Sequence, residues 1–207
     1  MGIKQSKRNK NFLDEKSLRK LYMEEGKSIK EISKILNCSV HKISYWMLKY
    51  NINTRSISEA VYLKNNPNGD PFIFNKPKTI NDSWLLGMGL GLYWGEGTKA
   101  DKVSVRLGNT DPELVSTFIQ FLVKIFGIHR KDLKFGLQLF NDVSVGEALD
   151  FWQKKLKIDK SQFYKTVVTK SRAKGTYRKK SKYGVLTVYY HNRKLRDLLV
   201  NMLPRTA

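Results

Sequence analysis

Residues Trp84 to Gly97 read W-L-L-G-M-G-L-G-L-Y-W-G-E-G. The first twelve residues carry no charge, and the next, Glu96, places a single carboxylate beside a glycine. Three glycines recur at every fourth position: Gly87, Gly91 and Gly95. On a helix they form one bare stripe that another backbone can approach closely. A glycine inside a helix costs about 1 kcal/mol relative to alanine, so we expect tight packing along the stripe to compensate.

The segment from Gly89 to Gly97 resembles the signature helix of the LAGLIDADG homing endonucleases. Two glycines and a leucine match the nine-letter motif, and Glu96 takes its acidic position. In that family two such helices pack against each other, and each presents one acid to a divalent metal. The resemblance implies that Glu96 is the metal-binding, catalytic acid and that Mg²⁺ is the cofactor. It also implies that Gly87, Gly91 and Gly95 form a dimer interface, because a chain with one motif must pair with a second copy.

The chain has 207 residues and a formal net charge of +21, with 39 Lys and Arg against 18 Asp and Glu. Such an imbalance fits a polyanionic partner, and we expect double-stranded DNA; the alternative is a merely basic or ribosome-associated protein. The lone Cys38 excludes an intrachain disulfide and a cysteine zinc cluster. The basic N-terminus lacks the apolar run of a secretory signal. We therefore expect a cytoplasmic protein (nucleoid-associated in a prokaryote), without a membrane partner or a small-molecule cofactor.

Three of the five prolines fall between residues 65 and 78, in a stretch that cannot continue a helix. This composition predicts a helical domain at 1–65, a linker at 66–80 and a second domain at 81–207. Lys and Arg outnumber Asp and Glu by 14 to 6 in the first domain and by 23 to 11 in the second. Both domains could therefore contact the same polyanion.

Residues 14–50 predict three short helices, with Asp14, Ser28 and Ser39 as amino-terminal caps. The tract 28–52 resembles the helix-turn-helix of the resolvase and homeodomain-like group, whose second motif helix enters the major groove. In the third helix we expect Val40, Ile43, Met47 and Leu48 to point inward. The residues expected on DNA are Ser39, His41, Lys42, Ser44 and Tyr45, followed by Arg55. The alternative is a three-helix protein-interaction module.

In the second domain the apolar periodicity predicts the order α-β-α-β-α-β-β-α. We expect an α+β fold: a LAGLIDADG-like antiparallel or mixed sheet with helices on one face and a polar, basic opposite face. Arg106, Lys134 and Gln138 fall on that opposite face and are candidate DNA contacts. The family core, α-β-β-α-β-β-α, has a second strand after the motif helix that this sequence lacks. This sequence also predicts an additional helix near 145–157.

Residues 154–182 contain twelve Lys and Arg against one acid. The densest part is expected to be a hairpin between the last two strands that contacts phosphates. Its basic residues are Lys170, Arg172, Lys174, Arg178, Lys179, Lys180 and Lys182. The alternative is an ordinary solvated basic loop.

These features together predict a site-specific endonuclease of double-stranded DNA of the homing type. Metal-dependent phosphodiester hydrolysis would use one acid from each subunit of a homodimer. The alternatives are a non-catalytic, DNA-binding transcriptional regulator on the same fold and an RNA-splicing maturase. The nearest other acid, Asp101, is expected to be a surface turn residue.

Overall fold

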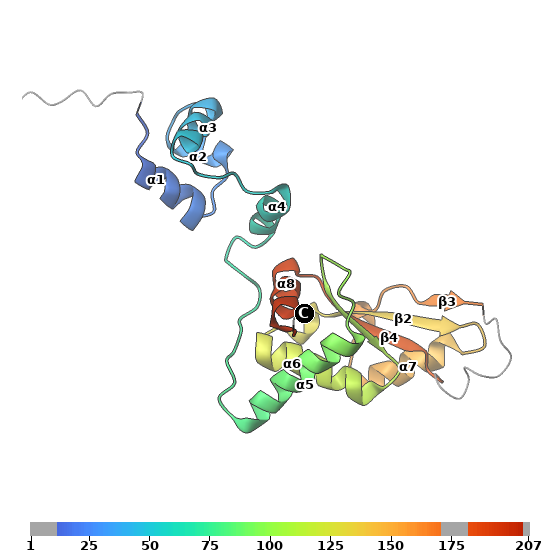
Figure 1. Ribbon diagram of the computed structural model, residues 1–207. Helices are drawn as coiled ribbons and strands as arrows, with labels where there is room; N and C mark the ends of the chain where they lie inside the picture. Colours follow the sequence, from blue (N-terminus) through green and yellow to red (C-terminus); the bar gives the residue numbers. More distant parts are fainter. Residues whose placement is uncertain (1–11, 171–181, 205–207) are drawn as a thin grey trace, which may run out of the picture. The chain divides into compact units, whose positions relative to one another are not determined.

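The computed structural model describes residues 12–170 and 182–204 (Figure 1). The chain is an α+β protein in which amino-terminal helices precede a four-stranded mixed sheet with packed helices. It divides into two compact units between Asp70 and Pro71. No helix among the described residues is both long enough and apolar enough to cross a membrane.

The amino-terminal unit consists of short helices. They are α1 (Glu15–Arg19), which continues into a π-helical turn (Lys20–Glu24), α2 (Ile29–Ile35), α3 (Val40–Lys49) and α4 (Ile57–Asn65). The three predicted caps are confirmed, because the side chains of Asp14, Ser28 and Ser39 each accept a hydrogen bond from a backbone amide of the helix that follows. Helix α4 was not predicted. It buries none of its residues, so its sequence carries little amphipathic signal.

The core of this unit is small. It contains Leu18, Tyr22, Ile32, Ile43, Met47 and Ile52. The expectation that Val40 and Leu48 point inward is wrong, because their exposed fractions are 43% and 79%. The half-buried Trp46 packs there instead and stacks on Tyr50 with 5.3 Å between ring centroids. Trp46 faces the core because Ile43, Trp46, Met47 and Tyr50 stand at i, i+3, i+4 and i+7. These positions share one side of a helix.

The second unit follows the predicted order α-β-α-β-α-β-β-α. Its elements are α5 (Ile80–Glu96), β1 (Val105–Asn109), α6 (Pro112–Phe126), β2 (Lys134–Phe140), α7 (Val145–Leu156), β3 (Val167–Thr169), β4 (Val185–Tyr190) and α8 (Arg193–Met202). Short 3₁₀ turns at Arg130–Asp132 and Lys160–Gln162 precede β2 and β3. The single strand between α5 and α6 and the additional helix α7 are both confirmed.

The strands lie in the order β1-β4-β2-β3. Strand β4 pairs antiparallel with both β1 and β2, and β2 pairs parallel with β3. The predicted hairpin between β3 and β4 is wrong, because β2 lies between these two strands. The parallel β2–β3 pair requires a crossover, and α7 lies in that connection.

Alternate residues of the three longer strands are buried, and all of them face the helices. Helices α5, α6 and α7 lie on one side of the sheet (Figure 1). Helix α8 adds Leu195 and Leu199 to the same core. The opposite face of the sheet, which we call the open face, carries the intervening side chains.

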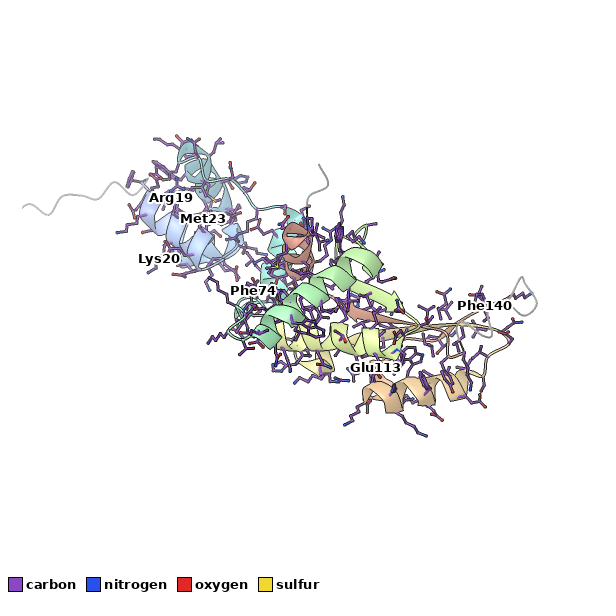
Figure 2. The ribbon with its side chains drawn as sticks, turned by 60° about the horizontal axis from the view of Figure 1, so that its bottom comes forward. Arg19, Lys20, Met23, Phe74, Glu113 and Phe140 are labelled. Carbon is purple, nitrogen blue, oxygen red and sulfur yellow. The ribbon has the colours of Figure 1, made fainter. Side chains whose placement is uncertain are left out.

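Residues 71–75, within the predicted linker, pack on α6. The amides of Ile73 and Asn75 donate to the carbonyls of Phe126 and Ile125 at 3.0 and 2.8 Å. Phe74, labelled in Figure 2, stacks on Phe126 with 5.5 Å between ring centroids. The second unit therefore begins ahead of α5. Figure 2 also labels Glu113 on α6, whose carboxylate pairs with Lys155 of α7 at 3.0 Å.

Candidate functional site

Glu96 is the last residue of α5, and its side chain is exposed. Within 12–170 and 182–204, no hydrogen bond or ion pair engages its carboxylate. A carboxylate stabilises the positive, amino-terminal end of a helix, whereas Glu96 stands at the negative end. Glu96 therefore does not stabilise its own helix through the helix dipole.

The segment after Glu96 is fixed to the sheet. Gly97 pairs with Leu107 of β1 in an isolated antiparallel bridge, and the Thr98 amide donates to the Arg106 carbonyl at 3.0 Å. Any Cβ on Gly97 would overlap the ring and carbonyl of Tyr93. Glycine is required here because the backbone turns directly against a buried aromatic ring. This close contact sets where the Glu96 backbone stands.

The glycine stripe lies on the outside of the unit. A Cβ built on Gly87, Gly91 or Gly95 meets no atom within 4 Å. The opposite stripe of α5, formed by Leu85, Gly89 and Tyr93, is buried. Inside the chain the packing glycine is Gly89, where a Cβ would overlap the ring of Phe121 on α6. The packing role of Gly89 was not predicted, because both sides of this helix are apolar and the motif does not show which of them faces inward.

Large apolar side chains flank the open glycines. Ile80, Trp84, Met88 and Trp94 have exposed fractions of 88%, 58%, 40% and 51%. At 100° per residue they fall with the three glycines on one side of α5. A contiguous exposed apolar surface of this kind is typical of a protein interface. We call these seven residues the α5 stripe.

The open face brings together the three sheet residues predicted to contact DNA. Arg106, Lys134 and Gln138 all lie on it, and Tyr189 of β4 stands in register between Arg106 and Lys134. Sequence reasoning missed Tyr189, although it alternates with the buried Val188 and Tyr190. The alternation of buried and outward residues begins only at Val105: just before β1, Val103 is 61% exposed and Ser104 is fully buried.

Asp101 is bound within the loop between α5 and β1. Its carboxylate accepts hydrogen bonds from the Val103 amide and the Ser104 hydroxyl, each at 2.8 Å, and pairs with Nε of Arg106. Burial raises the pKa of Asp101, but these donors and the charge of Arg106 together hold it below its usual value. Asp101 is thus a structural carboxylate that fixes Arg106, and both of its oxygens accept from groups of the same loop and strand.

An imidazole lies beside this cluster and was not predicted. His191 accepts from or donates to the Tyr164 hydroxyl through Nε2 at 2.6 Å, and its ring stacks on Tyr189 at 6.0 Å between centroids. Partial burial, followed by the charge of Arg106, lowers the pKa of His191, while Asp101 acts in the opposite direction. These effects together favour the neutral form of the ring.

The amino-terminal unit exposes the beginning of α3. Ser39 caps this helix by accepting from the Lys42 amide at 3.2 Å, and the Ser44 hydroxyl donates to the Val40 carbonyl at 3.1 Å. His41 is exposed, Lys42 is half-buried, and Tyr45 has an exposed fraction of 60%. The five side chains predicted on this helix therefore lie around its first turns, and the Tyr45 ring contacts Trp46 edge-on with 5.6 Å between centroids.

Arg55 serves the packing of the amino-terminal unit. Its Nη1 donates to the carbonyls of Gly26 and Lys27 at 3.0 and 3.2 Å, and its guanidinium lies 4.0 Å from the centroid of the Tyr22 ring. The Arg55 amide also donates to the Tyr22 hydroxyl at 2.8 Å. A guanidinium held on one side by two carbonyls and on another by a ring is poorly placed to reach DNA.

We expect Arg55→Ala to destabilise the amino-terminal unit by about 2 kcal/mol, because two charge-assisted hydrogen bonds and a cation–π contact are lost. Amide hydrogen exchange of residues 12–70 measures the effect directly. The matched control is Lys64→Ala, which removes one exposed positive charge and should stay within about 0.5 kcal/mol of wild type. Unchanged protection in the Arg55 variant would return this residue to the candidate DNA contacts.

Of the seven basic residues in 170–182, the structure describes Lys170 and Lys182, and both are exposed. The Lys182 ammonium lies 5.3 Å from the ring centroid of Tyr183. The other predicted phosphate contacts, Arg172, Lys174, Arg178, Lys179 and Lys180, lie outside the described residues. The segment connects strands separated by β2, so its two ends reach different parts of the sheet.

A divalent cation takes oxygen ligands, chiefly carboxylates and carbonyls. Among the described residues no three His, Cys, Asp or Glu side chains gather into a cluster that could hold a metal ion. Within that part of the chain, Glu96 therefore belongs to no cluster of possible metal ligands. Comparison with known proteins found no matching family model, no matching curated protein and no matching solved structure.

Proposed function

We propose that this chain is a site-specific, metal-dependent endonuclease of double-stranded DNA that works as a homodimer. The observation that carries the proposal is the end of α5, where Glu96 is exposed and unpaired within the described residues, and where the backbone after it packs closely against Tyr93. A free, solvent-accessible carboxylate at a fixed place in the backbone is suited to binding Mg²⁺. When bound, the metal supplies activation of water and charge stabilisation in phosphodiester hydrolysis.

The α5 stripe supports the homodimer. Two copies packed through the open glycines bring their helix backbones close together and cover the exposed Trp84, Met88 and Trp94. A two-fold axis running along the helices places both copies of Glu96 at the same end. The two carboxylates then complete the metal site that one chain leaves incomplete, and the cation offsets their mutual repulsion.

The open face supports duplex binding. Strands β1, β2 and β4 present Arg106, Lys134, Gln138 and Tyr189 on a surface that the helices do not cover. Gly97 and Thr98 pair with β1 through an isolated bridge and one hydrogen bond. They do so at the place where the LAGLIDADG core has two strands. Helix α7 and the parallel strand β3 are departures from that core. We therefore propose a LAGLIDADG-like fold with a modified carboxy-terminal half.

The amino-terminal unit supports a second contact with the duplex. Helices α2 and α3 are joined by residues 36–39, where Asn37 has a φ of 46°. This arrangement fits a helix-turn-helix whose recognition helix is α3, with His41, Lys42 and Tyr45 at its exposed beginning. Lysine and arginine in both units would bind phosphates and give the affinity a steep dependence on salt.

Selection from a pool of randomised duplexes, followed by sedimentation of the complex, tests the binding and the stoichiometry. We expect a selected sequence with two related half-sites, bound by two chains. Absence of duplex binding at moderate salt would reject the proposed function, and one chain per selected duplex would reject the shared metal site. Sequence-specific binding that leaves the duplex intact with magnesium would instead favour the transcriptional regulator.

We expect Tyr45→Ala and Lys42→Ala to alter base preference in one part of the selected sequence, because both residues begin the proposed recognition helix. Each substitution should lower the preference for its base about tenfold or more. The matched control is Lys64→Ala, which removes the same charge as Lys42→Ala but lies on α4. An equal loss of affinity on every sequence in all three variants would contradict the role given to α3.

A further inference from the structure

The arginine on the open face is held in an unusual way. Nε of Arg106 donates to the Ser104 hydroxyl at 2.8 Å and also pairs with the Asp101 carboxylate. Asp101 is 9% exposed and Ser104 is fully buried, so both partners are rigid parts of the fold. These contacts lie on one edge of the guanidinium. Its two Nη groups have no acceptor within residues 12–170 and 182–204.

The flat side of the guanidinium is also supported. Its central carbon lies 5.2 Å from the centroid of the Tyr189 ring. That ring lies over Gly136, where a Cβ would come within 3.0 Å of it, so the missing side chain lets Tyr189 lie low on the sheet. Tyr164 contacts Tyr189 edge-on at 5.5 Å, and the His191 ring stacks on Tyr189 with 6.0 Å between centroids. The guanidinium of Arg106 is thus held along one edge by Asp101 and Ser104, and the Tyr189 ring lies beside it.

A long, flexible side chain pays conformational entropy when it binds, and this cost falls when the side chain is already held in place. Binding to a phosphate needs charge but little orientation, as lysine demonstrates elsewhere. Reading a base needs a planar donor pair at a set angle. A held guanidinium that presents two Nη donors matches the O6 and N7 acceptors of guanine in the major groove.

We propose that Arg106 is a specificity-determining residue that reads one guanine in each half-site, and that Asp101 is the positioning residue that aims it. This inference rests on the proposed function, because it requires that the open face bind duplex DNA. It assigns Lys134, the other cation in the same row of the sheet, to phosphate contact. Its ammonium is exposed and, among the described residues, is held by one long contact, to the Ser161 carbonyl at 3.5 Å.

The test compares the wild-type chain with Arg106→Lys, Asp101→Asn and Lys134→Ala in the same duplex selection. In the wild type we expect guanine at one position per half-site. Arg106→Lys keeps the charge and loses the planar donor pair, so that guanine preference should fall about ten- to a hundred-fold while the other positions are kept. Asp101→Asn should weaken the same single preference without changing the salt dependence of binding.

Lys134→Ala is the matched control. It should lower affinity on all sequences and reduce the slope of log affinity against log salt by about one, with the base preferences unchanged. A chemical arm uses 7-deazaguanine, which lacks the N7 acceptor, at the selected position. This base should weaken the wild type and leave the binding of Arg106→Lys little changed, because coupled partners give non-additive effects.

The outcomes separate this inference from the proposed function. A wild-type chain that selects no duplex would reject the function itself. Selective binding in which Arg106→Lys keeps the guanine preference would overturn the role of Arg106 alone. A uniform loss of affinity with Arg106→Lys and no effect of 7-deazaguanine would make Arg106 a phosphate contact. If Asp101→Asn does not fold, Ser104→Ala removes the other hydrogen-bond acceptor of Arg106 Nε and should weaken the same guanine preference.

Discussion

Replacement of Glu96 by glutamine is expected to abolish metal-dependent cleavage while leaving folding and duplex binding close to wild type. Glutamine keeps the shape of the side chain and removes the charge that would hold the cation. Loss of metal-based stabilisation worth several kcal/mol corresponds to a rate decrease of about a thousand-fold or more. The native fold should persist because, within the described part of the chain, the Glu96 carboxylate makes no hydrogen bond or ion pair.

The assay measures cleavage of the selected duplex at saturating protein concentration, so that a change in binding does not enter the rate. Asp101→Asn is a useful comparison, because Asp101 is the nearest other acid in sequence and is bound to Arg106 and Ser104. It should keep cleavage at saturation. Cleavage by the Glu96→Gln protein at the wild-type rate would remove Glu96 from the metal site.

The two kinds of glycine in α5 should respond in opposite ways to alanine. Gly89→Ala forces a methyl group into the Phe121 ring, which is itself fully buried, so the second unit should lose about 3 kcal/mol or more of its stability. Gly91→Ala places a methyl group in open space on an exposed helix. It should raise the stability of the isolated chain by up to about 1 kcal/mol through helix propensity.

Chemical denaturation at low protein concentration, where dimers are absent, measures both effects. Gly91→Leu extends the comparison, because it should fold like the wild type and fail to dimerise on DNA. The bulkier side chain would hold the two helices apart along the α5 stripe. A Gly91→Leu protein that still sediments as two chains per duplex would place the dimer interface elsewhere.

Much of the second unit could be predicted from sequence because its apolar periods are long and its caps are strong. Asp111 and Pro112 set the beginning of α6, and the alternation in β2 identified the buried face of the sheet. The order of the strands was not predictable in the same way. Nothing local in residues 163–169 shows that β3 pairs parallel with β2, because register and partner depend on contacts distant in sequence.

The errors at the candidate site have physical causes. Both sides of α5 are apolar, so periodicity could not distinguish the buried Gly89 from the open Gly91. Arg55 looked like a surface cation because its partners, two backbone carbonyls and the Tyr22 ring, leave no mark in the neighbouring sequence. His191 carried no motif, and only the pairing of the strands brings it beside Tyr189 and Tyr164.

The measurement that tests the central claim most directly is cleavage of the selected duplex by the unmodified chain, with magnesium and with a chelator in its place. We predict that magnesium yields one cut in each strand at a fixed position between the two half-sites, because the two copies of Glu96 meet at the two-fold axis. The chelator should prevent both cuts and leave the complex bound. A duplex that is bound by two chains and stays intact in magnesium would contradict the assignment as an endonuclease.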